Sequence, residues 1–225
     1  MIFRLISSTD LPDVIDLWRE AFGDSEKAIR FFFESFPDCI SYAAEEDGQV
    51  VSMVHGLPQT LSPDVPAAYL YAVATRKSHR GRGLCRKLMA FAEADLASRG
   101  VACCMLTPGE PELFRFYTRL GYAAAFTRNR TAFSGGECIS AAEYIRLRER
   151  VLDRPHVVYD LRTMAYAQQV YGLTFYRTAD GCAATGEDYT AEVLPQDLGG
   201  TPFAMIKWLS ESRPLRNAYL GLALE

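Results

Sequence analysis

The chain has 225 residues, a net charge of −4 and a pI near 5.5, and 49% of its residues are hydrophobic. This length allows one full domain with a smaller second one. The acidic balance supplies no basic field that would attract nucleic acid or an anionic membrane, so any anion site must be local. The start of the chain does not resemble a signal peptide, and there is no apolar run of about 18 residues. We therefore expect a cytoplasmic protein that binds neither nucleic acid nor a membrane.

The cysteines give no indication of a metal centre. No two of them form a Cys-x-x-Cys pair, and two adjacent ones lie in an apolar run. We therefore predict free, mostly buried thiols and no metal site. They are Cys39, Cys85, Cys103, Cys104, Cys138 and Cys182.

The first part of the chain predicts a strand and two helices. The strand is expected at residues 2–7, and apolar residues recur at helical spacing over 11–22. A second helix at 26–36 carries three successive phenylalanines from Phe31, more aromatic surface than one buried face needs. Core packing and the lining of a substrate pocket are both consistent with these rings.

The pattern then changes to strands. Residues 39–44, 50–57 and 67–75 predict an antiparallel meander, with turn residues between the first two. A helix is expected at 82–98, followed by an apolar strand at 101–107. The order strand, glycine turn, helix, strand is therefore predicted here.

A break at residues 134–136 divides the chain. Before it, a helix at 111–120 and a strand at 122–133 complete a first domain, residues 1–133. Residues 137–225 predict a small α+β domain. Its mixture of helices and strands is also consistent with a degenerate copy of the first half of the chain. Its roles stay open among capping a cleft, forming a homodimer and binding a substrate. Its helices are expected at 141–152, 161–171 and 202–212, and its strands at 173–178 and 189–194.

A glycine-rich turn lies between the strand at 67–75 and the next helix. Arg80-Gly81-Arg82-Gly83 would expose successive backbone N–H groups at a helix start, where the helix dipole also favours an anion. The glycines permit close approach to a phosphate, and the arginines add charge-assisted hydrogen bonds. The sequence of this turn is consistent with a pyrophosphate site and also with an ordinary tight turn that has a basic edge.

Two familiar phosphate-binding motifs do not fit this turn. Residues 81–86 lack the third glycine of a dinucleotide-binding fingerprint. No Gly-Lys-Ser/Thr follows, as a P-loop requires. Phosphate binding therefore stays open, whereas these two folds are excluded.

Two motifs in the same order resemble those of the GNAT acyltransferases. That family has Arg/Gln-x-x-Gly-x-Gly/Ala at the junction of its fourth strand and third helix, and this chain has Arg80, Gly83 and, departing at the last position, Cys85. About thirty residues later, Tyr117 stands four residues before Gly121 and a tyrosine, as in the family's second hallmark. The resemblance implies an α/β fold (α+β mixed) with a central mixed sheet, an antiparallel meander and splayed parallel strands.

The resemblance also implies a donor site for acetyl-CoA. In the family, the glycine loop holds the pyrophosphate, and backbone groups of the fourth strand hold the pantetheine arm. One strand N–H, near Val73, would also polarise the thioester carbonyl. The residues implied are Val73, Thr75, Arg80, Gly81, Arg82, Gly83, Leu84 and Cys85.

Tyr117 is the catalytic residue that the resemblance implies. In the family this hydroxyl lies beside the thioester sulfur, where it would protonate the departing CoA thiolate. A packing tyrosine on an amphipathic helix is the alternative. For the base that accepts the amine proton, His55 and Glu34 are candidates by expected position, as is Tyr71, and each is also consistent with a structural role.

The sequence thus predicts an N-acetyltransferase that uses acetyl-CoA and an unidentified small-molecule or peptide amine. Residues 107–111, rich in proline, resemble the enhanced-intracellular-survival branch of the family. Two other hypotheses stay open: a catalytically silent CoA-binding or protein-interaction module, and a structural domain that uses the glycines only as a turn. The acceptor and the use of longer acyl chains are not predicted.

Overall fold

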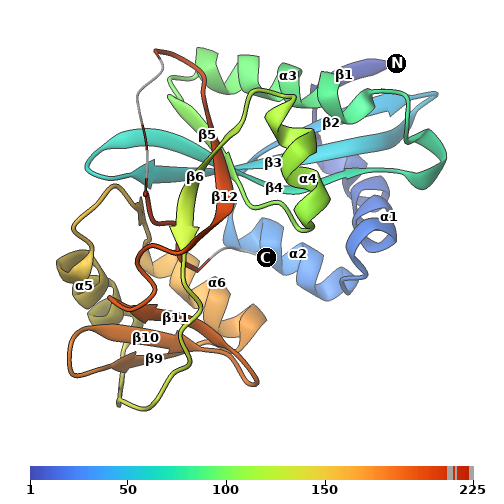
Figure 1. Ribbon diagram of the computed structural model, residues 1–225. Helices are drawn as coiled ribbons and strands as arrows, with labels where there is room; N and C mark the ends of the chain where they lie inside the picture. Colours follow the sequence, from blue (N-terminus) through green and yellow to red (C-terminus); the bar gives the residue numbers. More distant parts are fainter. Residues whose placement is uncertain (212–214, 216, 223–225) are drawn as a thin grey trace. The chain divides into compact units, whose positions relative to one another are not determined.

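The computed structural model describes residues 1–211, 215 and 217–222, which form two compact units (Figure 1). Unit 1 comprises Met1–Pro58, Pro66–Leu106 and the segment that begins at Trp208. Unit 2 comprises Gln59–Val65, Thr107–Lys207 and the described residues near the end of the chain. The sequence break at 134–136 lies within unit 2, and the division into domains 1–133 and 137–225 stays a prediction.

Unit 1 is built on a mixed sheet with the strand order β1-β2-β3-β4-β5. β1 pairs antiparallel with β2, and β2 with β3, whereas β4 and β5 pair in parallel. The middle residues of the three long strands are buried and mostly apolar, as expected for strands covered on both faces. The predicted mixed α/β fold is thereby confirmed. The strands are β1 (Ile2–Leu5), β2 (Ile40–Glu46), β3 (Gln49–Leu61), β4 (Val65–Thr75) and β5 (Cys103–Leu106).

Three helices cover this sheet, α3 on one face and α1 and α2 on the other (Figure 1). Tyr42 of β2 donates a hydrogen bond to Asp95 of α3 at 2.8 Å, which fixes α3 to its face. On the other face, the His55 ring of β3 lies 5.1 Å from the Trp18 ring of α1. The helices are α1 (Leu11–Phe22), α2 (Glu26–Ser35) and α3 (Leu84–Ser98).

Unit 2 contains a separate antiparallel sheet with the order β11-β10-β9-β7. A second strand pair, β6 with β12, is also antiparallel. The elements are α4 (Pro111–Thr118), β6 (Ala123–Arg128), β7 (Glu137–Ile139), α5 (Ala141–Val151), β8 (Val157–Val158), α6 (Leu161–Tyr171), β9 (Thr174–Arg177), β10 (Cys182–Thr185), β11 (Thr190–Leu194) and β12 (Thr201–Trp208).

The small sheet of unit 2 repeats the topology of the first half of unit 1. In unit 1, the order β1-α1-α2-β2-β3-β4 gives adjacent strands β1-β2-β3-β4. In unit 2, the order β7-α5-α6-β9-β10-β11, with the short β8 between the helices, gives adjacent strands β7-β9-β10-β11. In both, the first strand pairs antiparallel with the strand that follows the two helices.

The core of unit 2 contains a buried ion pair. Arg148 of α5 is 1% exposed on its side chain, and its Nε lies 3.2 Å from Oε1 of the fully buried Glu192. The guanidinium also donates to the Val157 carbonyl at 2.7 Å, and the Tyr144 hydroxyl donates to Glu192. The pairing of the two charges and these hydrogen bonds offset the cost of burying them, although no described group hydrogen-bonds to Oε2 of Glu192. The Glu192 side chain raises the pKa of Arg148 further above its usual value, against the opposing effect of desolvation.

One predicted helix is wrong. Residues 202–212 were expected to be helical, but Thr201–Trp208 is the strand β12, bends follow at 209–211, and residue 212 lies outside the described residues. The apolar run from Phe203 to Ile206 fits either structure by periodicity. Antiparallel pairing from Thr201 opposite Arg128 to Ile206 opposite Ala123 selects the strand.

Other predicted elements agree with the structure, with shifts at their ends. The helices at 11–22 and 161–171 coincide with α1 and α6, whereas that predicted from residue 82 begins at Leu84. The short strands β7, β8 and β10 were not predicted. All six cysteines are free, as expected; Cys138 is exposed, Cys39 and Cys85 are half-buried, and the other three are buried.

Candidate functional site

The glycine loop is shaped by two left-handed residues in front of α3. Gly81 has φ 77° and Gly83 has φ 73°, a region that residues with a Cβ rarely adopt. Gly83 is the N-cap of the 15-residue α3, whose first turn contains no acidic residue. Arg80 to Gly83 are all exposed. The loop therefore presents an accessible helix start with the partial positive charge of the helix dipole.

Leu84 anchors the start of α3. Its side chain is 4% exposed and packs in a cluster with Ala44 of β2 and Val51 of β3. Burial raises the pKa of the neighbouring Cys85 thiol to about 12, so this cysteine is a neutral thiol at physiological pH. Leu84 thus fixes the start of the helix, and Cys85 adds no charge to the loop.

The end of β4 directs backbone groups away from β3. Pairing of β4 with β5 extends from Ala67 to Tyr69. Ala72 then has φ 47°, an uncommon value for a residue with a side chain. The Arg76 N–H donates to Val51 of β3 at 2.9 Å. Because backbone groups alternate along a strand, those of Thr75 and Val73 face the opposite side, beyond the last residues that pair with β5.

The loop arginines have different environments. Arg80 is exposed, and its Nε donates to the Thr75 carbonyl at 3.2 Å. Arg82 makes a two-point contact with Glu46 of β2, whose Oε2 also lies 3.2 Å from Nε2 of His79. Hydrogen bonding to Arg82 lowers the pKa of Glu46, and Glu46 raises the pKa of Arg82. Glu46 and Ala72 were not singled out in the sequence, because neither belongs to a recognisable local pattern.

His55 lies inside an aromatic cluster of unit 1. It is fully buried, and its ring contacts Trp18, Phe32 and Phe33 with centroids 5.1, 5.9 and 5.4 Å away. Nδ1 lies 2.8 Å from the Ser41 hydroxyl, and no described group hydrogen-bonds to Nε2. Burial lowers the pKa of His55 to about 3, so the imidazole is neutral at physiological pH.

The other acceptor-side candidates are more accessible. Glu34 on α2 is exposed, and none of the described residues hydrogen-bonds to it. Tyr71 on β4 is half-buried, and its ring stacks on Phe32 at 5.2 Å. Phe32 and Phe36 are buried in the core, whereas Phe31 and Phe33 are partly exposed. The aromatic run therefore contributes both to the core and to accessible surface.

Tyr117 lies in unit 2, near the end of the short helix α4. Its side chain is 7% exposed, and its ring contacts Phe116 and Tyr122 at 5.1 and 5.9 Å. Its carbonyl accepts hydrogen bonds from Leu120 and Tyr122 at 2.9 and 3.1 Å. These contacts hold the tyrosine at the turn that Gly121, with φ 93°, makes possible.

Comparison with known proteins identifies the family. Residues 3–125, more than half of the chain, match the model of the acetyltransferase (GNAT) domain. The chain belongs to the GNAT acetyltransferase family. No curated protein is significantly similar to this GNAT protein in sequence.

Two solved structures share the GNAT fold over most of the chain. A conserved protein from Enterococcus faecalis V583, described as a probable N-acyltransferase, is 17% identical with a TM-score of 0.69. A GCN5-related N-acetyltransferase from Kribbella flavida is 17% identical with a TM-score of 0.67. In each case the match covers 92% of this chain and 72% of the other. At this identity the likeness concerns the fold.

The described residues show neither a metal-binding group nor a membrane-spanning helix. They contain no group of three or more His, Cys, Asp or Glu side chains arranged to hold a metal ion. Within the same part of the chain, no helix combines the length and apolar character needed to cross a bilayer.

Proposed function

We propose that this GNAT protein transfers an acetyl group from acetyl-CoA to an amine of a small molecule or peptide. The observation that carries the proposal is the loop with Gly81 and Gly83 in left-handed conformation directly before α3. Exposed N–H groups at such a helix start suit a pyrophosphate. The acetyl thioester would supply the activated acyl group.

The donor site would use backbone and arginine groups of unit 1. The N–H groups of the loop from Gly81 to Cys85 would bind phosphate oxygens, with Arg80 and Arg82 adding charge-assisted hydrogen bonds. Because the Arg76 N–H donates to Val51 of β3, alternation along the strand would turn the backbone of Thr75 and Val73 away from β3, where it could pair with an extended pantetheine arm. The Val73 N–H is also our proposed donor to the developing oxyanion.

Tyr117 is our proposed general acid for the thiolate leaving group, on the basis of the family motif that it shares. His55 and Glu34 are the proposed bases. The unpartnered Nε2 of His55 favours it as a proton acceptor, whereas its low pKa makes it a weak one. Glu34 has the advantage of exposure, which would let it act through water. Membership of the enhanced-intracellular-survival branch, a homodimer and a cytoplasmic location stay predictions.

Release of free CoA from acetyl-CoA, followed with a thiol reagent against a panel of amines, tests the proposal. Time-dependent release that requires one class of amine is expected, together with acetyl-CoA binding by calorimetry. Binding without release for any amine would favour the silent CoA-binding module. If acetyl-CoA neither binds nor shifts thermal unfolding, the glycine loop serves only as a turn and the proposal fails.

A further inference from the structure

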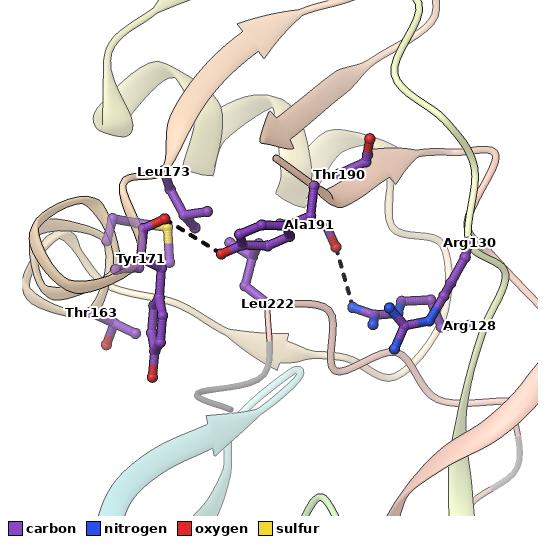
Figure 2. A pocket seen from close by; sticks show the side chains of 11 residues that line it. Arg128, Arg130, Thr163, Tyr171, Leu173, Thr190, Ala191 and Leu222 are labelled. Carbon is purple, nitrogen blue, oxygen red and sulfur yellow. Dashed lines mark hydrogen bonds between the residues drawn. The ribbon is translucent and has the colours of Figure 1, made fainter. Parts of the chain in front are cut away.

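Unit 2 contains a cavity of about 400 Å³ that the donor and acceptor groups proposed above do not use. The end of β6, the helix α6 and the strand β11 contribute to its walls (Figure 2). Its volume is within the range of about 300–1,000 Å³ typical of small-molecule sites. Each of the described residues that line it belongs to unit 2.

Two arginines give this cavity a positive wall. Figure 2 shows the side chains of Arg128 and Arg130 projecting to the same part of it. Arg128 is 8% exposed, donates to the Ala191 carbonyl at 3.2 Å and lies 4.7 Å from the Phe203 ring. It is thus held in place. Arg130 is exposed, and none of the described residues hydrogen-bonds to it or pairs with it. Its guanidinium is available to an anion.

None of the described residues that line the cavity is acidic. Asp160, which is not among these residues, accepts a hydrogen bond from the Thr163 hydroxyl and lies 3.7 Å from Nε of Arg162. A guanidinium with open donors can form charge-assisted hydrogen bonds with a carboxylate.

Apart from Thr163 and Thr190, the other described residues of the wall are apolar or aromatic. Met164 and Ala167 face the cavity from α6, and Leu173 lies just before β9. Tyr189 also lines the cavity, and its hydroxyl lies 3.5 Å from the carbonyl oxygen of Tyr171. These side chains offer contact to a hydrocarbon or aromatic body.

We propose that this cavity binds a small organic acid with an apolar or aromatic body. The carboxylate would lie against Arg130, within reach of the charge of Arg128, and the apolar body against Met164 and Leu173. The ligand would be recognised by unit 2 alone, independently of acetyl-CoA. The inference therefore goes beyond the proposed acetyl transfer and does not depend on it.

Calorimetric titration with octanoate and with 3-phenylpropionate, without acetyl-CoA, tests this site. We expect saturable binding of at least one acid, and much weaker binding of the matched alcohols, 1-octanol and 3-phenylpropanol. Arg130→Gln should weaken acid binding about tenfold or more, since it removes a charged hydrogen-bond donor. Arg150→Gln, at another exposed arginine of unit 2, is the matched control and should leave binding unchanged.

Ala167→Phe, which would fill the cavity, should abolish binding of the acid while the thermal unfolding transition is retained. If this variant does not fold, the comparison of Arg130→Gln with Arg150→Gln decides. Equal effects of those two variants, equal binding of acid and alcohol, or no saturable binding to the wild type would overturn the proposal. Gly81→Ala, which disturbs only the donor loop, should bind the acid normally, so failure of the acetyl-transfer proposal is recognised separately.

Discussion

Arg82 and Glu46 form a two-point ion pair directly before α3, with Nη1 2.8 Å from Oε2 and Nη2 2.6 Å from Oε1. The pair joins the glycine loop to β2. It also places a carboxylate beside the surface proposed to receive a pyrophosphate, so Glu46 and the ligand would compete for the Arg82 guanidinium. The net effect of Glu46 on a bound phosphate should be repulsive.

Glu46→Gln should therefore tighten binding of acetyl-CoA, by about two- to fivefold at low salt, because Arg82 is released and one negative charge is removed. Calorimetric titration measures the dissociation constant. Glu45→Gln is the matched control, since Glu45 pairs with Arg4 and not with the loop. Weaker binding in Glu46→Gln would mean that the ion pair positions Arg82 for the ligand, contrary to our expectation.

Gly81→Ala should weaken acetyl-CoA binding about tenfold. The added methyl group meets no neighbouring atom within 4 Å, so the effect arises from φ 77°, which costs an alanine about 1 kcal/mol. Gly100→Ala introduces the same strain at φ 87°, also in open space, but just after the far end of α3. Both variants should lose similar thermal stability, and only Gly81→Ala should lose affinity. Equal affinities would show that the loop conformation does not matter for the ligand.

Tyr117→Phe should lower kcat about 10- to 100-fold with little change in the dissociation constant of acetyl-CoA, because a thiolate is already a fair leaving group. Steady-state kinetics with the best amine of the panel gives kcat. Tyr122→Phe is the control, since this ring packs against Tyr117 at 5.9 Å and is not assigned a chemical role. An unchanged kcat in Tyr117→Phe would remove this hydroxyl from the mechanism.

Local sequence patterns predicted the elements that local interactions determine. Helix α1 has apolar residues at helical spacing, a proline in its first turn and Gly23 after its last residue, and its predicted bounds are those observed. The glycine loop was also recognisable, because its residue types correspond to the backbone angles that Gly81 and Gly83 adopt. At these positions the chemistry of single residues was sufficient.

Long-range pairing was not predictable in the same way. The apolar run in β12 became a strand because it pairs with β6, which is more than seventy residues earlier in the chain. The ion pair of Arg82 joins residues 36 positions apart, and the cavity beside Arg130 combines β6, α6 and β11. The residue pattern within one segment does not predict which distant segment it will contact.

His55→Gln should reduce the dependence of stability on pH. The wild-type imidazole is neutral in the folded protein because burial lowers its pKa from 6.5 to about 3, whereas the unfolded chain protonates it near pH 6.5. Protonation of His55 in the unfolded chain should therefore lower the free energy of unfolding of the wild type by about 1.4 kcal/mol for each pH unit as the pH decreases from 6.5 toward 3. Urea unfolding at several pH values measures the slope, and the variant should lack this contribution. Equal slopes from pH 4 to 6 would contradict it.

Arg148→Met should destabilise unit 2 selectively. The substitution leaves the buried carboxylate of Glu192 without its cation, a change that typically costs about 3–5 kcal/mol. Hydrogen exchange read by mass spectrometry should show faster exchange in α5, β10 and β11, with α3 of unit 1 unaffected. Arg148→Met combined with Glu192→Gln should recover part of the protection, because no charge is then left unpaired. Equal protection in the single and double variants would show that packing of the arginine, and not its charge, stabilises this core.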